Sequence, residues 1–205
     1  QRQMCIRDSP TALKPGWAKG CNISPDDARR LSDKLLGRLG MTDFELVSSQ
    51  VAEPLTERGN RAERGRYEYK YVQVADGIPL SSGEPDSTGC TVAIDDRGVV
   101  DARLTRLELG ESKIVNSRVM TLDGVLAVLQ KKLAAAGLVK DSIVKEISFE
   151  YMSVEDPETY NSTVFPCWRF CIATTATLEQ YGEYENDIII NAVTGEFYAV
   201  TNRYE

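Results

Sequence analysis

The chain has 205 residues, of which 24 are basic, 31 are acidic and none is histidine, and its net charge is −7. Without histidine the chain alone cannot form a Ser-His-Asp or Cys-His catalytic set, or a histidine-ligated zinc, iron or haem site. The acidic balance argues against nucleic acid or an anionic membrane surface as the main partner. We therefore expect no cofactor and no metal, although carboxylate, lysine, tyrosine or cysteine chemistry stays open.

The first nine residues, QRQMCIRDS, resemble translated adaptor sequence of the kind that precedes some metagenomic reading frames. We expect residues 1–9 to be non-native and residues 1–23 to be a leader, with the natural start and any signal or lipid-attachment cysteine further upstream. The alternative is a genuine disordered tail. No apolar stretch approaches the roughly 20 residues that a membrane-spanning helix needs.

A helix is predicted after Ser24, which is a typical N-cap and is followed by a proline and two acidic residues. Leucines recur at helical spacing, and Gly40 would end the helix. Strands are predicted at residues 44–47, 67–75, 91–94 and 99–107, with a turn at 95–98. Residues 53–66 and 81–89 are rich in charge or in Gly, Ser and Pro, and they predict loops.

The same order of elements recurs 97 residues later, with a helix that begins after Thr121 and strands at 143–154, 165–175, 188–190 and 196–201. Three pairs of capping or turn residues share this offset: Ser24 and Thr121, Gly40 and Gly137, and Gly98 and Gly195. We infer a duplicated unit in an α+β protein, at residues 24–110 and 111–205. In each unit, one helix would cover an antiparallel sheet of about four strands.

Two segments carry a resemblance to a known family. The turn NAVTGE at residues 191–196 resembles the NAxTGE turn of the PepSY domain family, and PCWRF at residues 166–170 is similar to the PxWR strand of YycI-type regulators of a bacterial sensor kinase. GIPL at residues 77–80 resembles a segment of the same group. The resemblance covers roughly residues 24–201 as two tandem copies, but the first copy has DDRG at residues 95–98 in place of the turn motif.

The resemblance implies an extracytoplasmic bacterial protein, often a lipoprotein or membrane-tethered domain, that regulates a protease or sensor kinase without catalysis. Its partner would be a protein or peptide of the cell envelope, and it would meet the membrane only through an upstream anchor. One alternative is a carboxylate-dependent hydrolase, most simply a glycosidase. Its acids would come from predicted loops: Glu155, Asp156, Glu158, Glu179, Glu183, Glu185 and Asp187. A second alternative is a spacer domain of a larger surface protein. We assign no catalytic residue.

Aromatic side chains alternate along two predicted strands. Tyr67, Tyr69 and Tyr71 share one face of the first strand, and Trp168 and Phe170 share one face of the second. We expect these stripes to pack beneath the helices. The alternative is an exposed groove for a peptide or glycan, in which these five residues and Arg169 would bind the partner.

The cysteines allow two interpretations. Cys167 and Cys171 would stand about 13 Å apart on one strand, at roughly 3.3 Å per residue, which is too far for a disulfide. Either could pair with Cys21 or Cys90 in an oxidising compartment; alternatively, all four are small buried apolar side chains. Arg169 shares their face, so we expect it to point to solvent or to meet a carboxylate such as Glu150, with anion binding as the functional alternative.

Overall fold

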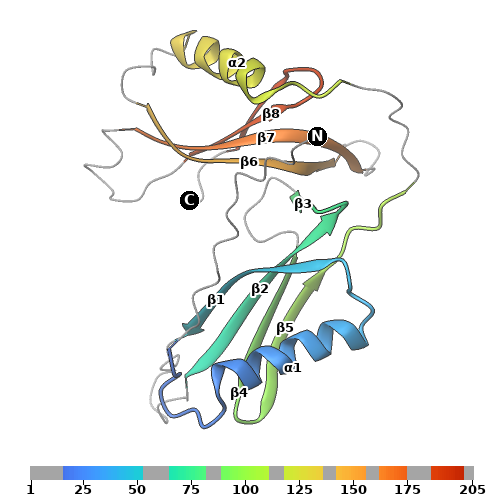
Figure 1. Cartoon of the computed structure of the whole chain (residues 1–205), viewed down its shortest axis with the longest axis vertical. Helices are drawn as coiled ribbons and strands as arrows, with labels where there is room; N and C mark the ends of the chain where they lie inside the picture. Colours follow the sequence, from blue (N-terminus) through green and yellow to red (C-terminus); the bar gives the residue numbers. More distant parts are fainter. Residues whose placement is uncertain are drawn as a thin grey trace. The chain divides into compact units, whose positions relative to one another are not determined.

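The computed structural model describes residues 16–52, 65–81, 89–110, 118–135, 142–155, 162–174 and 186–200. These residues form an α+β protein with two helices and nine strands (Figure 1). The chain divides into two compact units. Among the described residues, the N-terminal unit comprises 16–77 and 89–107, and the C-terminal unit comprises 78–81, 108–110 and everything from 118 onward. The expected non-native start at residues 1–9 lies outside the described residues.

In the N-terminal unit, helix α1 (Pro25–Arg38) begins as its sequence predicts. The hydroxyl of Ser24 accepts a hydrogen bond from the backbone N–H of Asp27 at 3.1 Å, which satisfies one of the free donors in the first turn. The carboxylates of the first turn add a favourable interaction with the helix dipole. The helix ends at the cap residue Leu39, directly before the predicted stop at Gly40.

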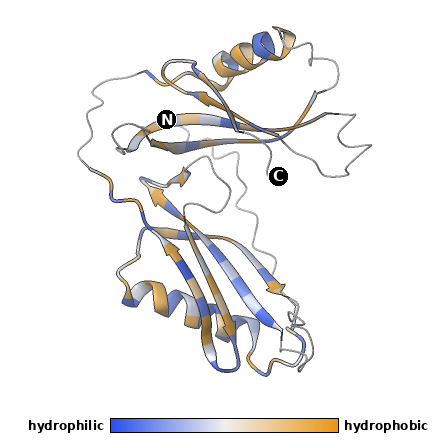
Figure 2. Cartoon of the chain, turned by 180° about the vertical axis from the view of Figure 1, so that it is seen from behind, coloured by the Kyte–Doolittle hydropathy of each residue, from blue (hydrophilic) through white to orange (hydrophobic). Residues whose placement is uncertain are grey.

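The N-terminal sheet is an antiparallel meander in the order β1 (Phe44–Ala52), β2 (Arg66–Ala75), β4 (Gly89–Asp95) and β5 (Gly98–Thr105). Charged residues alternate along β2 with buried tyrosines, and Figure 2 colours the strands of this sheet by hydropathy. Helix α1 packs against one face of this sheet, and Ala28 and Leu36 meet Val92 and Ile94 in the core. Because charged residues and tyrosines alternate along β2, one face of the sheet carries most of the apolar surface.

In the C-terminal unit, Thr121 caps helix α2 (Leu122–Ala135), since its hydroxyl accepts a hydrogen bond from the backbone N–H of Gly124 at 3.3 Å. An antiparallel meander follows: β6 (Ser142–Glu155), β7 (Ser162–Thr174), β8 (Asn186–Asn191) and β9 (Phe197–Val200). Val125 and Leu129 of α2 are buried against Phe170, Ile172 and Ile190. The predicted helix end at Gly137 lies outside the described residues.

One strand departs from the predicted topology. Strand β3 (Ile78–Ser81) runs parallel to β6, with Leu80 opposite Tyr151, so the C-terminal sheet is mixed and has the order β3-β6-β7-β8-β9. The expectation of purely antiparallel strands is therefore wrong for this sheet. The physical reason is that β3 comes from the region that we placed in residues 24–110, and a long connection permits a parallel pairing. Leu80 has no exposed surface.

Ile23, the residue before the N-cap of α1, is held on both of its backbone groups. The N–H of Ile23 donates to Oδ1 of Asp96 at 3.0 Å, in the turn between β4 and β5. The carbonyl of Ile23 accepts a hydrogen bond from the Tyr67 hydroxyl at 3.2 Å. The sheet thus fixes where the helix begins.

The C-terminal unit repeats this arrangement 97 residues later. The N–H of Met120 donates to the carbonyl of Ala192 at 2.7 Å, in the turn between β8 and β9. The carbonyl of Met120 accepts a hydrogen bond from Nε1 of Trp168 at 3.2 Å. Both turns end in a glycine with positive φ, Gly98 and Gly195, as the sequence predicts. Apart from β3, the two units therefore share the order of one helix followed by four strands, and they share the way in which the sheet holds the helix.

Candidate functional site

The tyrosines of β2 lie in the core, as one of the two interpretations predicts. Tyr67, Tyr69 and Tyr71 are 0%, 2% and 4% exposed. The alternative in which these tyrosines line a groove and bind a partner is therefore corrected, because a partner can touch only exposed side chains. Burial raises the pKa of both Tyr69 and Tyr71 well above the usual value for tyrosine, so neither acts as an acid or base near neutral pH.

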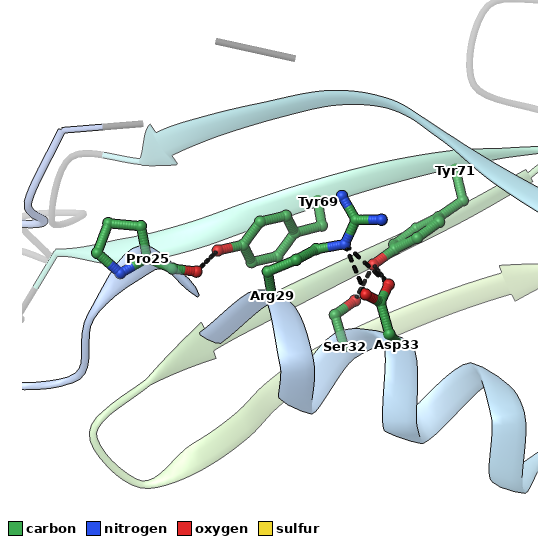
Figure 3. A network of polar contacts seen from close by, with 6 residues as sticks. All are labelled: Pro25, Arg29, Ser32, Asp33, Tyr69 and Tyr71. Carbon is green, nitrogen blue, oxygen red and sulfur yellow. Dashed lines mark hydrogen bonds and ion pairs between the residues drawn. The ribbon is translucent and has the colours of Figure 1, made fainter. Parts of the chain in front are cut away.

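The hydroxyls of two of these tyrosines tie β2 to helix α1 (Figure 3). Tyr69 donates a hydrogen bond to the carbonyl of Pro25 at 2.7 Å, at the first residue of the helix. The Tyr71 hydroxyl lies 2.7 Å from the hydroxyl of Ser32 and 2.9 Å from Oδ1 of Asp33. Ser32 is completely buried, so this contact satisfies a polar group that would otherwise be costly in the core.

Arg29 completes this network at the surface of the helix (Figure 3). Its Nε donates to Asp33 at 2.8 Å, and its guanidinium lies 5.5 Å from the centre of the Tyr71 ring. The network joins the helix to the sheet with satisfied partners at each step. Its chemistry is that of a structural anchor, because the tyrosine in it is held in its neutral form.

Trp168 and Phe170 also belong to a core, so their assignment as partner-binding residues is corrected in the same way. Phe170 has no exposed surface and packs beneath α2. Trp168 is half-buried, and its ring meets Phe149 edge to face at a centroid distance of 5.1 Å. Its indole N–H is used to hold the start of α2, so this side chain has a structural task already.

Arg169 lies on the other face of the C-terminal sheet, between carboxylates on both neighbouring strands. Its guanidinium forms an ion pair with Asp187 on β8 and lies 3.8 Å from Glu150 on β6. The side chains of Arg169, Asp187 and Glu150 are 21%, 4% and 9% exposed, respectively. The predicted contact with Glu150 is confirmed. Two acids against one base leave this cluster net negative, which disfavours the anion-binding alternative.

The charge of Arg169 is strongly held. Burial alone would lower the pKa of its guanidinium, but the hydrogen bond to Asp187 and the nearby carboxylates of Glu150 and Glu146 raise that pKa above its usual value. Ser148 donates a further hydrogen bond to Glu150 at 3.0 Å. We interpret the cluster as a buried electrostatic link across three strands.

The four described cysteines are thiols outside any disulfide: Cys21, Cys90 and Cys167 are buried, and Cys171 is half-buried. Burial raises the pKa of the Cys90 thiol to about 11, and it raises the pKa of Cys167 further. Such thiols are poor nucleophiles, because the thiolate is the reactive form. The interpretation of these residues as small buried apolar side chains fits Cys21, Cys90 and Cys167, whereas Cys171 is half-buried.

The buried thiol of Cys90 predicts a loss of stability at alkaline pH. The folded state keeps the Cys90 proton up to about pH 11, whereas the unfolded state loses it near pH 9. Stability is therefore fully present below pH 9 and falls by about 2–3 kcal/mol from this group as the pH rises to 11. Cys90→Val, which keeps the volume, should reduce this fall, as measured by urea unfolding at pH 7, 9 and 10.5. Parallel curves for the two proteins would show that another group causes it.

The acids that suggested a glycosidase do not form a described catalytic pair. Asp187 is engaged by Arg169, and the side chains of the others lie outside the described residues. Within the part of the chain that the structure describes, no three potential metal ligands of the His, Cys, Asp or Glu type lie together. The same residues contain no helix with the length and apolarity needed to cross a membrane.

The most exposed apolar strand was not singled out by the sequence. Seven of the eight residues of β5 are exposed, and among them Val99, Val100 and Leu104 are 43%, 37% and 41% exposed. β5 pairs with β4 along one side, and no strand in the described ranges pairs with its other side. The sequence signal was the alternation in GVVDARLT, which predicts a strand but does not say that the strand lies at an edge.

Comparison with known proteins gives a likeness of fold. No family model matches the chain, and no curated protein matches it. Among solved structures, it is similar to the crystal structure of an uncharacterized protein from Eubacterium rectale ATCC 33656, with a TM-score of 0.53 and 18% sequence identity. The match covers 87% of this chain and 56% of that chain. This chain thus spans about half the length of that protein, and the likeness supports the α+β fold.

Proposed function

We propose that this chain is a non-catalytic, extracytoplasmic bacterial protein of two tandem PepSY-like units, which binds a protein or peptide partner by strand addition at β5. The observation that carries the proposal is the exposed apolar edge of β5. An edge strand presents unpaired backbone donors and acceptors, and a partner in extended conformation can pair with them. The YycI-like segments suggest a sensor kinase or a protease as the regulated partner.

The candidate residues that the structure describes all have contacts that hold the fold, which leaves the β5 edge as the proposed binding surface. The described tyrosines, the aromatic pair of β7 and Arg169 all have structural partners within their own unit. The turn that resembles the PepSY motif is also structural. Oδ1 of Asn191 accepts hydrogen bonds from the N–H groups of Val193 and Thr194 at 2.9 and 3.0 Å, which fixes the turn that holds α2.

Strand addition has a precedent inside this chain. β3 is a short strand from a distant part of the sequence that joins the edge of β6. We propose a comparable pairing, in which an extended segment lies beside an edge strand, for a partner at β5.

The test is retention of an envelope protein on the immobilised chain. We expect the wild-type chain to retain a partner from bacterial envelope extract and the Val100→Lys/Leu104→Lys variant to lose it, because two ammonium groups then line the edge. The matched control is Ile143→Lys/Val144→Lys, which adds the same charge at two exposed apolar residues of β6. Equal retention by both variants would contradict the proposal, and so would a wild-type chain that retains no envelope protein and does not associate with a second copy of itself.

A further inference from the structure

The sequence of β5 is complementary to itself. When two copies of GVVDARLT lie antiparallel with Ala102 opposite Ala102, each Asp101 faces Arg103 of the other copy. In the same register Val100 faces Leu104 of the other copy. Opposite charges and apolar side chains directly across two strands stabilise their pairing, whereas like charges destabilise it.

We infer that the partner at the β5 edge is a second copy of this chain, joined through two antiparallel β5 strands about a two-fold axis at Ala102. This inference rests on the proposed function, because it names the partner that adds a strand at that edge. A two-fold axis makes the interface isologous, so each favourable pair occurs twice. A residue directly opposite its own copy is compatible with either type of antiparallel pair.

The apolar side chains of β5 give this pairing a driving force. Ala102 and Leu104 lie opposite Val92 and Cys90 of β4, so they share the face of the sheet that α1 covers. Leu104 is nevertheless 41% exposed, because it lies where the sheet ends. A second copy would bring its Val100 beside this side chain and remove apolar surface from water on both copies.

The charged side chains of β5 are available for the same pairing. Arg103 and Asp101 of one chain lie 3.8 Å apart, and their side chains are 85% and 52% exposed. This contact within one strand is long and solvated, so it competes weakly with a partner on a neighbouring strand. In the dimer, each carboxylate would gain the guanidinium directly across the strand.

The charges also select one register. Moving the two-fold axis by one residue places Asp101 opposite Asp101 or Arg103 opposite Arg103, and both arrangements bring like charges together. Moving it by two residues in either direction removes the Asp101–Arg103 pairs. The irregularity opposite Ala93 and Ile94, which leaves Val100 without a partner on β4, limits the regular ladder to a few residues. We therefore expect a weak dimer, detected at high protein concentration.

The first experiment tests the register by cross-linking. In the full chain, Ala102→Cys places two thiols directly across the axis, where the Cα separation of about 4.5–5.5 Å allows a disulfide. We expect a reducible dimer on mild oxidation, in excess of that formed by the wild-type chain. The matched control is Val100→Cys, whose two copies would lie about 13 Å apart along the strands and should not cross-link.

The second experiment tests the charges by sedimentation equilibrium at low salt. Asp101→Arg and Arg103→Asp should each weaken self-association about tenfold, because two favourable pairs become two repulsive ones. A mixture of the two variants should recover the wild-type affinity, because each arginine then faces an aspartate of the other chain. Neither residue contacts a core, so both variants are expected to fold.

Two outcomes overturn the inference. One is a dimer whose affinity is the same for the wild type, for each charge variant and for their mixture, because the contact would then lie elsewhere. The other is a monomer at every concentration with no Ala102→Cys cross-link. If such a monomer still retains an envelope partner that Val100→Lys/Leu104→Lys loses, the inference fails while the proposed function stands. If no partner is retained either, both fail.

Discussion

Arg169→Met should lower the free energy of unfolding by about 3–5 kcal/mol, because it removes the base that two buried carboxylates contact. Asp187 and Glu150 are almost fully buried, and Met replaces the volume of the side chain without its charge. The loss therefore reports electrostatics more than packing. Urea unfolding followed by circular dichroism at pH 7 measures it.

The matched control for this variant is Arg30→Met. Arg30 also forms an ion pair with an aspartate, Asp27, but the two side chains are 74% and 53% exposed. Exposed pairs contribute about 0–1 kcal/mol, so this variant should lie close to the wild type. A loss of less than about 1 kcal/mol in Arg169→Met would show that the link across β6, β7 and β8 contributes little.

Gly89→Ala should be the most damaging small substitution in the N-terminal sheet, and it should lower the free energy of unfolding by about 3 kcal/mol or more. Gly89 has a φ of +129°, which side-chain-bearing residues rarely adopt, and an added Cβ would lie 2.4 Å from the carbonyl oxygen of Tyr71. That oxygen belongs to the backbone of β2, which pairs with β1 on one side and β4 on the other. The neighbour therefore cannot move aside at low cost.

Gly37→Ala provides a control of opposite sign. Gly37 lies within α1, and an added Cβ would meet no atom within 4 Å. Alanine has a higher helix propensity than glycine, so this variant should raise the free energy of unfolding by up to about 1 kcal/mol. Thermal and urea unfolding of the two variants should therefore diverge from the wild type in opposite directions. A Gly89→Ala protein within 1 kcal/mol of the wild type would show that β2 and β4 separate easily at this point.

Local patterns in the sequence predict the parts of this fold that local physics decides. Ser24 and Thr121 begin helices because a side-chain oxygen must satisfy the first free N–H groups. The alternation along β2 and β7 predicts which side chains face the helices. The cost of burying Arg169 predicts a carboxylate beside it, and Glu150 is that carboxylate.

The missed features depend on strand order, which no local pattern encodes. Asp187 contacts Arg169 only because β8 lies beside β7 in a particular register. The four residues of β3 include a proline and show no useful periodicity, and their partner strand comes much later in the chain. The exposure of β5 likewise follows from its place at an edge. The candidate site thus emerged from topology, although its residues were recognisable as a strand.

The pairing of β3 with β6 has a consequence for synthesis of the chain. Leu80 meets Tyr151, about 70 residues further along, so a ribosome adding about 5–20 residues per second needs several seconds to supply the partner. Until then the β6 partner of Leu80, a residue that ends fully buried, has not been made, although the four strands of the N-terminal unit have. The C-terminal sheet thus includes a segment that is synthesised before the rest of that sheet, and a fragment that starts at α2 would lack the strand that pairs in parallel with β6.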